Sequence, residues 1–154
     1  MNELLLPTLN LPPVDFRFSQ EGQSKQIFDL VRKRFVSLTP EEWVRQHFLH
    51  FMINEKKYPG SLMGVEMLVR VNELSQRADI VVYNNEGKPW MIVECKNTEV
   101  PLTQETFYQI ARYNLTLQVP YMVITNGLEH YCLLFNGKEF EYLDDLPDYQ
   151  LTNT

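Results

Sequence analysis

A short predicted β-hairpin with charged residues at its open end constrains the fold of this chain more than any other feature. Two apolar runs, residues 80–83 and residues 90–93, lie on either side of a turn sequence that contains Asn and Gly. Apolar and β-branched runs that flank such a turn are typical of two antiparallel strands. Asp79 and Glu94 stand directly outside the two runs, so the hairpin brings two acidic residues to one end.

The length of the turn sets the pairing of the two strands. If Tyr83 lies opposite residues 88–90, then Asp79 falls opposite residues 92–94. We therefore expect Asp79 and Glu94 to have neighbouring side chains where the two strands present the same face.

The tripeptide Glu94-Cys95-Lys96 gives this end of the hairpin its chemistry. Successive side chains of a strand point to opposite faces, so Glu94 and Lys96 share one face and Cys95 points to the other. Charged side chains at the end of a buried strand are costly unless they are paired or used. Two adjacent carboxylates repel each other, and a divalent cation removes the conflict. Oxygen ligands with few protein contacts suit Mg²⁺ or Mn²⁺, with water filling the other positions.

A metal held by Asp79 and Glu94 would favour the hydrolysis of phosphate esters. The cation lowers the pKa of a bound water and stabilises charge that develops on a phosphate. Lys96 can orient or activate that water, or neutralise the phosphate. Two acids and one lysine on adjacent strands therefore predict a metal-dependent hydrolytic site. The alternative is that Glu94 and Lys96 occupy an exposed strand end or form a simple ion pair.

A strong helix start lies at the sequence Thr-Pro-Glu-Glu. Thr39 can act as the N-cap, Pro40 suits the first helical position, and Glu42 completes a capping box. The helix is expected to continue to about residue 54, because apolar residues recur at helical spacing: Val44, Phe48, Leu49, Phe51 and Met52.

Glu41 is the candidate for a third acid at the site. On a helical wheel Glu41 lies near the centre of the apolar face, and Glu42 lies well off that centre. We therefore expect Glu41 to face inward as a metal ligand or a supporting acid. The alternative is that Glu41 only complements the dipole of the helix, as acids in a first helical turn do.

A second helix is expected at about residues 101–118. Gln109 and Tyr113 are four residues apart and share one helix face, with Arg112 and Asn114 beside them. This polar stripe could meet the Glu-x-Lys strand or contact nucleic acid. The alternative is a helix edge with a snorkelling tyrosine.

The remaining elements complete an α/β chain of the mixed, α+β kind. Further strands are expected at residues 26–38 with a turn near residues 32–33, and at residues 63–71, 121–125, 130–135 and 139–142. This order of elements predicts a mixed sheet flanked by helices. We expect one domain at residues 21–147, preceded by an extended arm at residues 1–20 and followed by a tail at residues 148–154.

The composition is ordinary for a soluble globular protein, and we expect a cytoplasmic location. The chain has 154 residues, 44% apolar, and a net charge of −6. No run approaches the length of a membrane span and no signal peptide is expected, so no membrane partner is expected. Cys95 and Cys132 lie in apolar runs, as expected for buried thiols in a reducing cytoplasm. No phosphate loop or dinucleotide motif is present, so no nucleotide cofactor is expected.

Five segments together resemble a known family. They are residues 38–46, 77–83, 93–97, 109–114 and 125–127. Through them the chain resembles the N-terminal nuclease domain of the R subunit of type I restriction enzymes, within the PD-(D/E)XK nuclease superfamily. One departure is that Ala78, and not Pro, precedes Asp79.

The resemblance implies a restriction-endonuclease-like fold, in which helices flank a central mixed β-sheet. It implies that Asp79 and Glu94 are metal ligands and that Lys96 is the catalytic lysine. The expected function is a Mg²⁺- or Mn²⁺-dependent nuclease that hydrolyses phosphodiester bonds, with DNA as the expected partner. A separate protein partner or a homodimer is also consistent with the resemblance.

Three more residues match positions of the family. Glu41 matches an acid often found on the first helix. Gln109 and Tyr113 match a Gln-x-x-x-Tyr motif that is associated with cleavage and DNA contact. The alternative function is a nuclease-fold module that binds nucleic acid or a protein partner without cutting, which the net charge of −6 favours.

Overall fold

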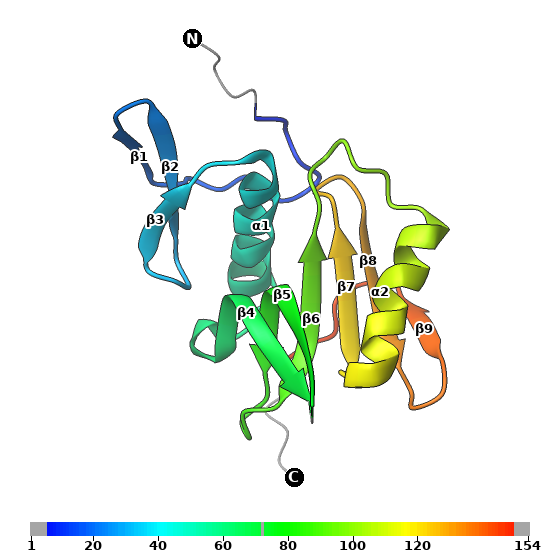
Figure 1. Cartoon of the computed structure of the whole chain (residues 1–154). Coiled ribbons are helices and arrows are strands. Elements are labelled where there is room, and N and C mark those ends of the chain that lie inside the picture. Colours follow the sequence, from blue (N-terminus) through cyan, green and yellow to red (C-terminus); the bar gives the residue numbers. More distant parts are fainter. Residues whose placement is uncertain (1–5, 72, 150–154) are drawn as a thin grey trace.

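The fold is organised around one mixed β-sheet. The structure, a computed structural model, describes residues 6–71 and 73–149, without the side chains of residues 71, 74, 113, 115 and 116. In this part of the chain, six strands pair side by side (Figure 1). In sheet order they are β4 (Met63–Val71), β5 (Leu74–Tyr83), β6 (Pro89–Cys95), β7 (Tyr121–Thr125), β8 (His130–Phe135) and β9 (Phe140–Leu143).

Parallel and antiparallel pairs occur in the same sheet. β6 and β7 are parallel, whereas the other neighbouring strands are antiparallel. Parallel neighbours need a crossover connection, and α2 (Gln104–Leu117) supplies it between β6 and β7. The predicted α+β class, with helices that flank a central mixed sheet, is confirmed.

The helices α1 (Pro40–His50) and α2 cover opposite faces of the sheet. Apolar residues of α1 pack in one buried cluster with Ile80 and Val93, and those of α2 pack in another with Val81 and Ile92. Because successive strand residues point to opposite faces, the two clusters lie on the two sides of the sheet.

Two short helical turns connect α1 to β4. The π-helical turn η1 (Phe51–Glu55) continues α1, and the 3-10 turn η2 (Gly60–Leu62) leads directly into the strand. None of the helices in the described residues is long and apolar enough to cross a membrane.

The hairpin of β5 and β6 has the predicted register. Ile80 pairs with Val93, so the next position along the hairpin places Asp79 beside Glu94. Asn84 closes the turn, because its side-chain oxygen accepts two backbone N–H groups of the loop at 2.9 and 3.0 Å. The turn chemistry therefore fixes which acidic residues meet at the far end of the hairpin.

A separate three-stranded sheet stands beside α1 (Figure 1). It consists of β1 (Phe18–Glu21), β2 (Ser24–Asp29) and β3 (Arg34–Ser37), all antiparallel. Phe16, Ile27 and Leu38 form its buried cluster, against which Trp43 of α1 packs. The predicted strand residues at 26–38 are strands, and they form their own small sheet on the helix.

The expectation that Glu42 lies off the buried face of α1 is wrong. Glu42 is 6% exposed, whereas the Glu41 side chain is 49% exposed. The helical wheel assumed one buried face, but the small sheet covers a second side of the helix. Thr39 caps the helix as predicted, by accepting the N–H of Glu42 at 3.0 Å. The Glu42 carboxylate instead accepts hydrogen bonds from Arg32 and Arg45.

The N-terminal arm lies against α1 and the loop between β7 and β8. Leu9 is 7% exposed, the Trp43 indole N–H donates to the Pro7 carbonyl at 2.9 Å, and the Asn10 N–H donates to the Gly127 carbonyl at 2.8 Å. Gly127 has a φ of +88°, and a Cβ at this position would lie 2.8 Å from the Leu9 side chain. Glycine therefore permits the close approach of the arm to this loop.

Candidate functional site

The regular backbone pairing of β5 is interrupted at Asp79 on the sides of both neighbouring strands. On one side, the pairing of β4 with β5 omits Glu66, which stands opposite Asp79 with a left-handed φ of 54°. On the other side, the pairing of β5 with β6 ends at Ile80 and Val93. The Asp79 Oδ2 atom accepts the backbone N–H of Cys95 at 2.8 Å. A carboxylate therefore takes the position of the next backbone acceptor, and Asp79 lies where the strands separate.

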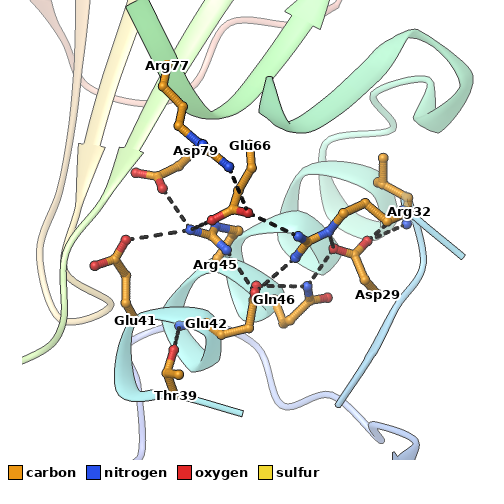
Figure 2. Close-up of polar contacts among 11 residues, drawn as sticks. Asp29, Arg32, Thr39, Glu41, Glu42, Arg45, Gln46, Glu66, Arg77 and Asp79 are labelled. Carbon is orange, nitrogen blue, oxygen red and sulfur yellow. Dashed lines mark hydrogen bonds and ion pairs between the residues drawn. The ribbon is translucent and has the colours of Figure 1, made fainter. Parts of the chain in front are cut away.

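Arg45 of α1 binds the second oxygen of the same carboxylate. Its Nη2 atom donates to Asp79 Oδ1 at 2.8 Å, and its Nη1 atom donates to Glu42 Oε1 at 2.8 Å (Figure 2). Nη2 also lies 3.3 Å from Glu66 and 3.5 Å from Glu41. The Arg45 side chain is only 6% exposed, so these acids surround a buried guanidinium.

A second arginine extends the network away from the site. Arg32 donates to Glu42 Oε1 at 2.9 Å and to Asp29 Oδ2 at 2.7 Å. Gln46 donates to both acids, at 3.1 Å to Glu42 and at 2.9 Å to Asp29. Figure 2 shows these residues as a continuous network of polar contacts that runs from the turn after β2 to Asp79. Acidic and basic side chains therefore alternate in this network, which connects the small sheet to Asp79.

The electrostatics of Arg45 follow from its neighbours. Burial alone would lower the pKa of the guanidinium, but Glu42 and Asp79 more than offset burial, and the pKa is raised above its ordinary value. Arg45 is therefore a permanent positive charge at this position.

Glu94 lies beside Asp79, and its pKa is raised. Burial is the largest cause, and together with the charge of Asp79 and a hydrogen bond between the two side chains it brings the pKa of Glu94 to about 8. This behaviour is expected when two carboxylates share one site.

Glu41 and Lys96 complete the group of charged residues. Burial and the charge of Asp79 raise the pKa of Glu41, although its side chain is half-exposed. The charge of Lys96 acts on both Glu41 and Glu94 in the opposite direction. The Lys96 backbone N–H donates to the Thr125 carbonyl at 2.8 Å, which fixes the chain where β6 ends. Among the described residues, none forms an ion pair with the Lys96 ammonium within 4.0 Å.

The donor set suits a hard divalent cation. Asp79, Glu94 and Glu41 offer carboxylate oxygens, which Mg²⁺ and Mn²⁺ prefer. The described part of the chain holds no group of three acidic, His or Cys side chains already gathered around one point. Two carboxylates with water in the other positions still fit Mg²⁺, which is often held by one or two protein carboxylates.

Of the two residues predicted on α2, the structure describes the side chain of Gln109 alone. Gln109 is exposed, and it has no hydrogen bond to the site carboxylates among the described residues. The Tyr113 side chain lies outside the described residues. Asn114 is buried and closes the end of α2, because its side chain donates to the Val119 carbonyl at 2.7 Å and accepts the Val119 N–H at 3.0 Å.

Sequence reasoning missed Arg45 and Glu66. A signal for Arg45 existed, because Glu42 and Arg45 stand three residues apart on a helix and therefore share a side. Glu66 carried a weaker signal, as the one acid of a mostly apolar strand. Neither pattern could reveal contact with Asp79, which depends on how α1 docks on the sheet.

The central mixed sheet, the flanking helices and the acidic group where β5 and β6 separate define an α+β domain of nuclease-like fold. Residues 40–147, more than half of the chain, match the family described as type I restriction enzyme R protein N terminus. The chain belongs to this family. A comparison with curated proteins gives no match.

Proposed function

We propose that this chain is a Mg²⁺-dependent nuclease of the PD-(D/E)XK type, which hydrolyses phosphodiester bonds in DNA. The observation that carries the proposal is that Asp79 and Glu94 lie side by side at the point where β5 and β6 separate. Their mutual repulsion raises the pKa of Glu94, and a divalent cation can relieve it. Membership of the restriction enzyme R family supports the same chemistry.

Each residue has a separate role in this proposal. Asp79 and Glu94 hold the cation, and Glu41 supplies a third carboxylate, directly or through water. When bound, the cation would lower the pKa of a water molecule and stabilise charge on the phosphate. Lys96 orients the attacking water and neutralises charge on the phosphate oxygens. Gln109 and Tyr113 contact the DNA.

The test is nicking of supercoiled plasmid DNA by the purified protein. With Mg²⁺ or Mn²⁺ the protein should nick the plasmid, and EDTA should stop the reaction. Lys96→Ala and Asp79→Ala should each lower the rate by about 10²-fold or more, because each removes a group that acts on the reacting atoms. Circular dichroism should show that both variants remain folded.

Lys88→Ala is the matched control for Lys96→Ala. Lys88 directly precedes β6 in the turn of the same hairpin, and its side chain is 74% exposed. Its removal should leave the rate unchanged. A wild-type protein that never cuts DNA or RNA with either metal would contradict the enzymatic proposal.

A second candidate function is a nuclease-fold module that binds nucleic acid or a protein partner without cutting. It is favoured by the Arg45 guanidinium, which already neutralises Asp79 in the absence of a metal. Calorimetry with Mn²⁺ separates the two candidates. A wild-type protein that binds no Mn²⁺, or binds it as well as Asp79→Ala does, would favour the non-cleaving module.

A further inference from the structure

Arg45 combines deep burial with direct contact to a proposed metal ligand. We infer that Arg45 is a positioning residue that aims the carboxylate of Asp79 toward the cation, an inference that rests on the proposed function. The hydrogen bond from Arg45 to Asp79 remains when the cation binds, and replacement of Arg45 weakens metal binding.

The contacts of Asp79 fix the plane of its carboxylate. Arg45 donates to Oδ1 from the side of α1, and the Cys95 N–H donates to Oδ2 from β6, each at 2.8 Å. These two donors, together with the hydrogen bond to Glu94, restrict rotation of the group and still leave a lone pair for a cation. A carboxylate held in this way binds a cation without first having to become ordered.

Arg45 is itself held in place by other hydrogen bonds, so moving it away from Asp79 would break them. Its Nη1 atom donates to Glu42, whose side chain is only 7% exposed and is also bound by Arg32 and Gln46. The N–H of Glu42 is bound in turn by the Thr39 cap, at the start of α1. The guanidinium therefore fixes Asp79 relative to α1, because it is bound to both.

Stability alone is a poor explanation for this network. Buried ion pairs are expensive to desolvate, and apolar residues of similar volume often stabilise a protein equally well. Glu66, which also contacts Arg45, adopts a left-handed backbone conformation that is unfavourable for a residue with a Cβ. Strain and buried charge at one site therefore point to a role of this network in fixing geometry.

Arg32 provides a matched control. Like Arg45, it is an arginine bound to Glu42 and near Glu66, and it is 13% exposed. No ion pair links Arg32 to Asp79 in the described network. Arg32→Met and Arg45→Met therefore remove similar amounts of buried charge, but only the second removes the contact with the proposed metal ligand.

The experiment measures Mn²⁺ binding to the full chain by calorimetry, beside the thermal midpoint of the metal-free protein. Arg45→Met should weaken Mn²⁺ binding by about 10-fold or more, as is typical when a group that orients a metal ligand is lost. Arg32→Met should lower the midpoint comparably but change the Kd less than about 2-fold. Arg45→Lys keeps the charge without the planar fork, so it should remain folded and show an intermediate Kd.

Two results would contradict the positioning role of Arg45. If Arg45 only repelled the cation, Arg45→Met would bind Mn²⁺ more tightly, and the inference would be wrong. Equal weakening by Arg32→Met would also overturn it, because the effect would then belong to the network as a whole.

A metal-free measurement separates this inference from the proposed function. A wild-type protein that binds no Mn²⁺ would end the metal-site proposal and the metal-aiming role of Arg45 together. The midpoints of Arg45→Met, Asp79→Asn and the double variant then show whether Arg45 orients Asp79 at all. Losses in the two single variants that simply add in the double variant would contradict that contact as well.

Discussion

At the scale of single residues, His47 is the buried titratable group that lies outside the candidate site on α1. The residue is 7% exposed, and neither ring nitrogen has a hydrogen-bond partner among the described residues. The ring packs against Phe16 and Trp43, with ring centroids 4.8 and 4.3 Å away. Burial, with a smaller contribution from His50, lowers the pKa of His47 to about 4.

The lowered pKa of His47 predicts that the contribution of this residue to stability is lost in mild acid. The folded state keeps the ring neutral, whereas the unfolded chain takes up a proton as the pH falls below about 6.5. The contribution is therefore constant above pH 6.5 and is lost progressively toward pH 4. Between pH 8 and pH 5 the loss should be about 2 kcal/mol. The difference in unfolding free energy between the wild type and His47→Leu should therefore change by this amount between pH 8 and pH 5, in favour of His47→Leu at the lower pH, as urea titrations can measure.

Parallel pH profiles for the wild type and His47→Leu would contradict this assignment. Glu94, whose pKa is raised into the same range, is present in both variants, so its contribution cancels in the difference.

At the scale of elements, the loop between β7 and β8 depends on one glycine. Gly127→Ala should lower the free energy of unfolding by about 2 kcal/mol or more, because the left-handed backbone disfavours a Cβ and because this atom would contact Leu9 at 2.8 Å. Gly137→Ala is the control, since Gly137 has a φ of +97° and no atom within 4 Å of an added Cβ. Gly127→Ala should be the more damaging variant in chemical denaturation. Equal losses would mean that backbone strain alone decides the effect.

Much of this level of structure could be predicted from the sequence. The hairpin of β5 and β6, the Thr39 cap and the limits of β4 follow from local patterns, namely turn residues, a capping side chain and an apolar run. The pairing of Asp79 with Glu94 followed as well, because counting across one turn needs no tertiary information.

What the sequence could not supply depends on contacts between distant elements. The burial of Glu42 arises from the docking of the small sheet on α1, which no helical wheel contains. Likewise, the contact of Arg45 with Asp79 joins a helix to a strand 34 residues further along the chain. The left-handed conformation of Glu66 has no local sequence signature, since neither Gly nor Asn marks the position.

At the scale of the whole molecule, residues that precede the family match help to build the domain. The match begins at residue 40, but Leu9 lies in the main core and Arg32 binds Glu42 beside the candidate site. The arm and the small sheet are therefore structural parts of this domain.

A shortened chain of residues 39–154 should accordingly be much less stable. It loses the apolar contacts of Leu9 and Ile27 and exposes the side of α1 that carries Trp43. We expect its thermal midpoint to fall by roughly 10 °C or more, as measured by circular dichroism. A chain that lacks only residues 1–5 is the control. A midpoint within about 2 °C of the full chain would show that residues 6–38 are dispensable for folding.

The two cysteines lend themselves to a chemical measurement of how the sheet opens. Cys95 and Cys132 are free, buried and in the same core cluster, on strands that β7 separates. Burial raises the pKa of Cys95 well above its ordinary value and the pKa of Cys132 to about 12. Because thiol reagents attack the thiolate, the folded chain should resist them until the core opens. The labelling rate of each thiol therefore reports the opening of the strand that carries it. Cys95 reports on β6, which ends in the candidate site.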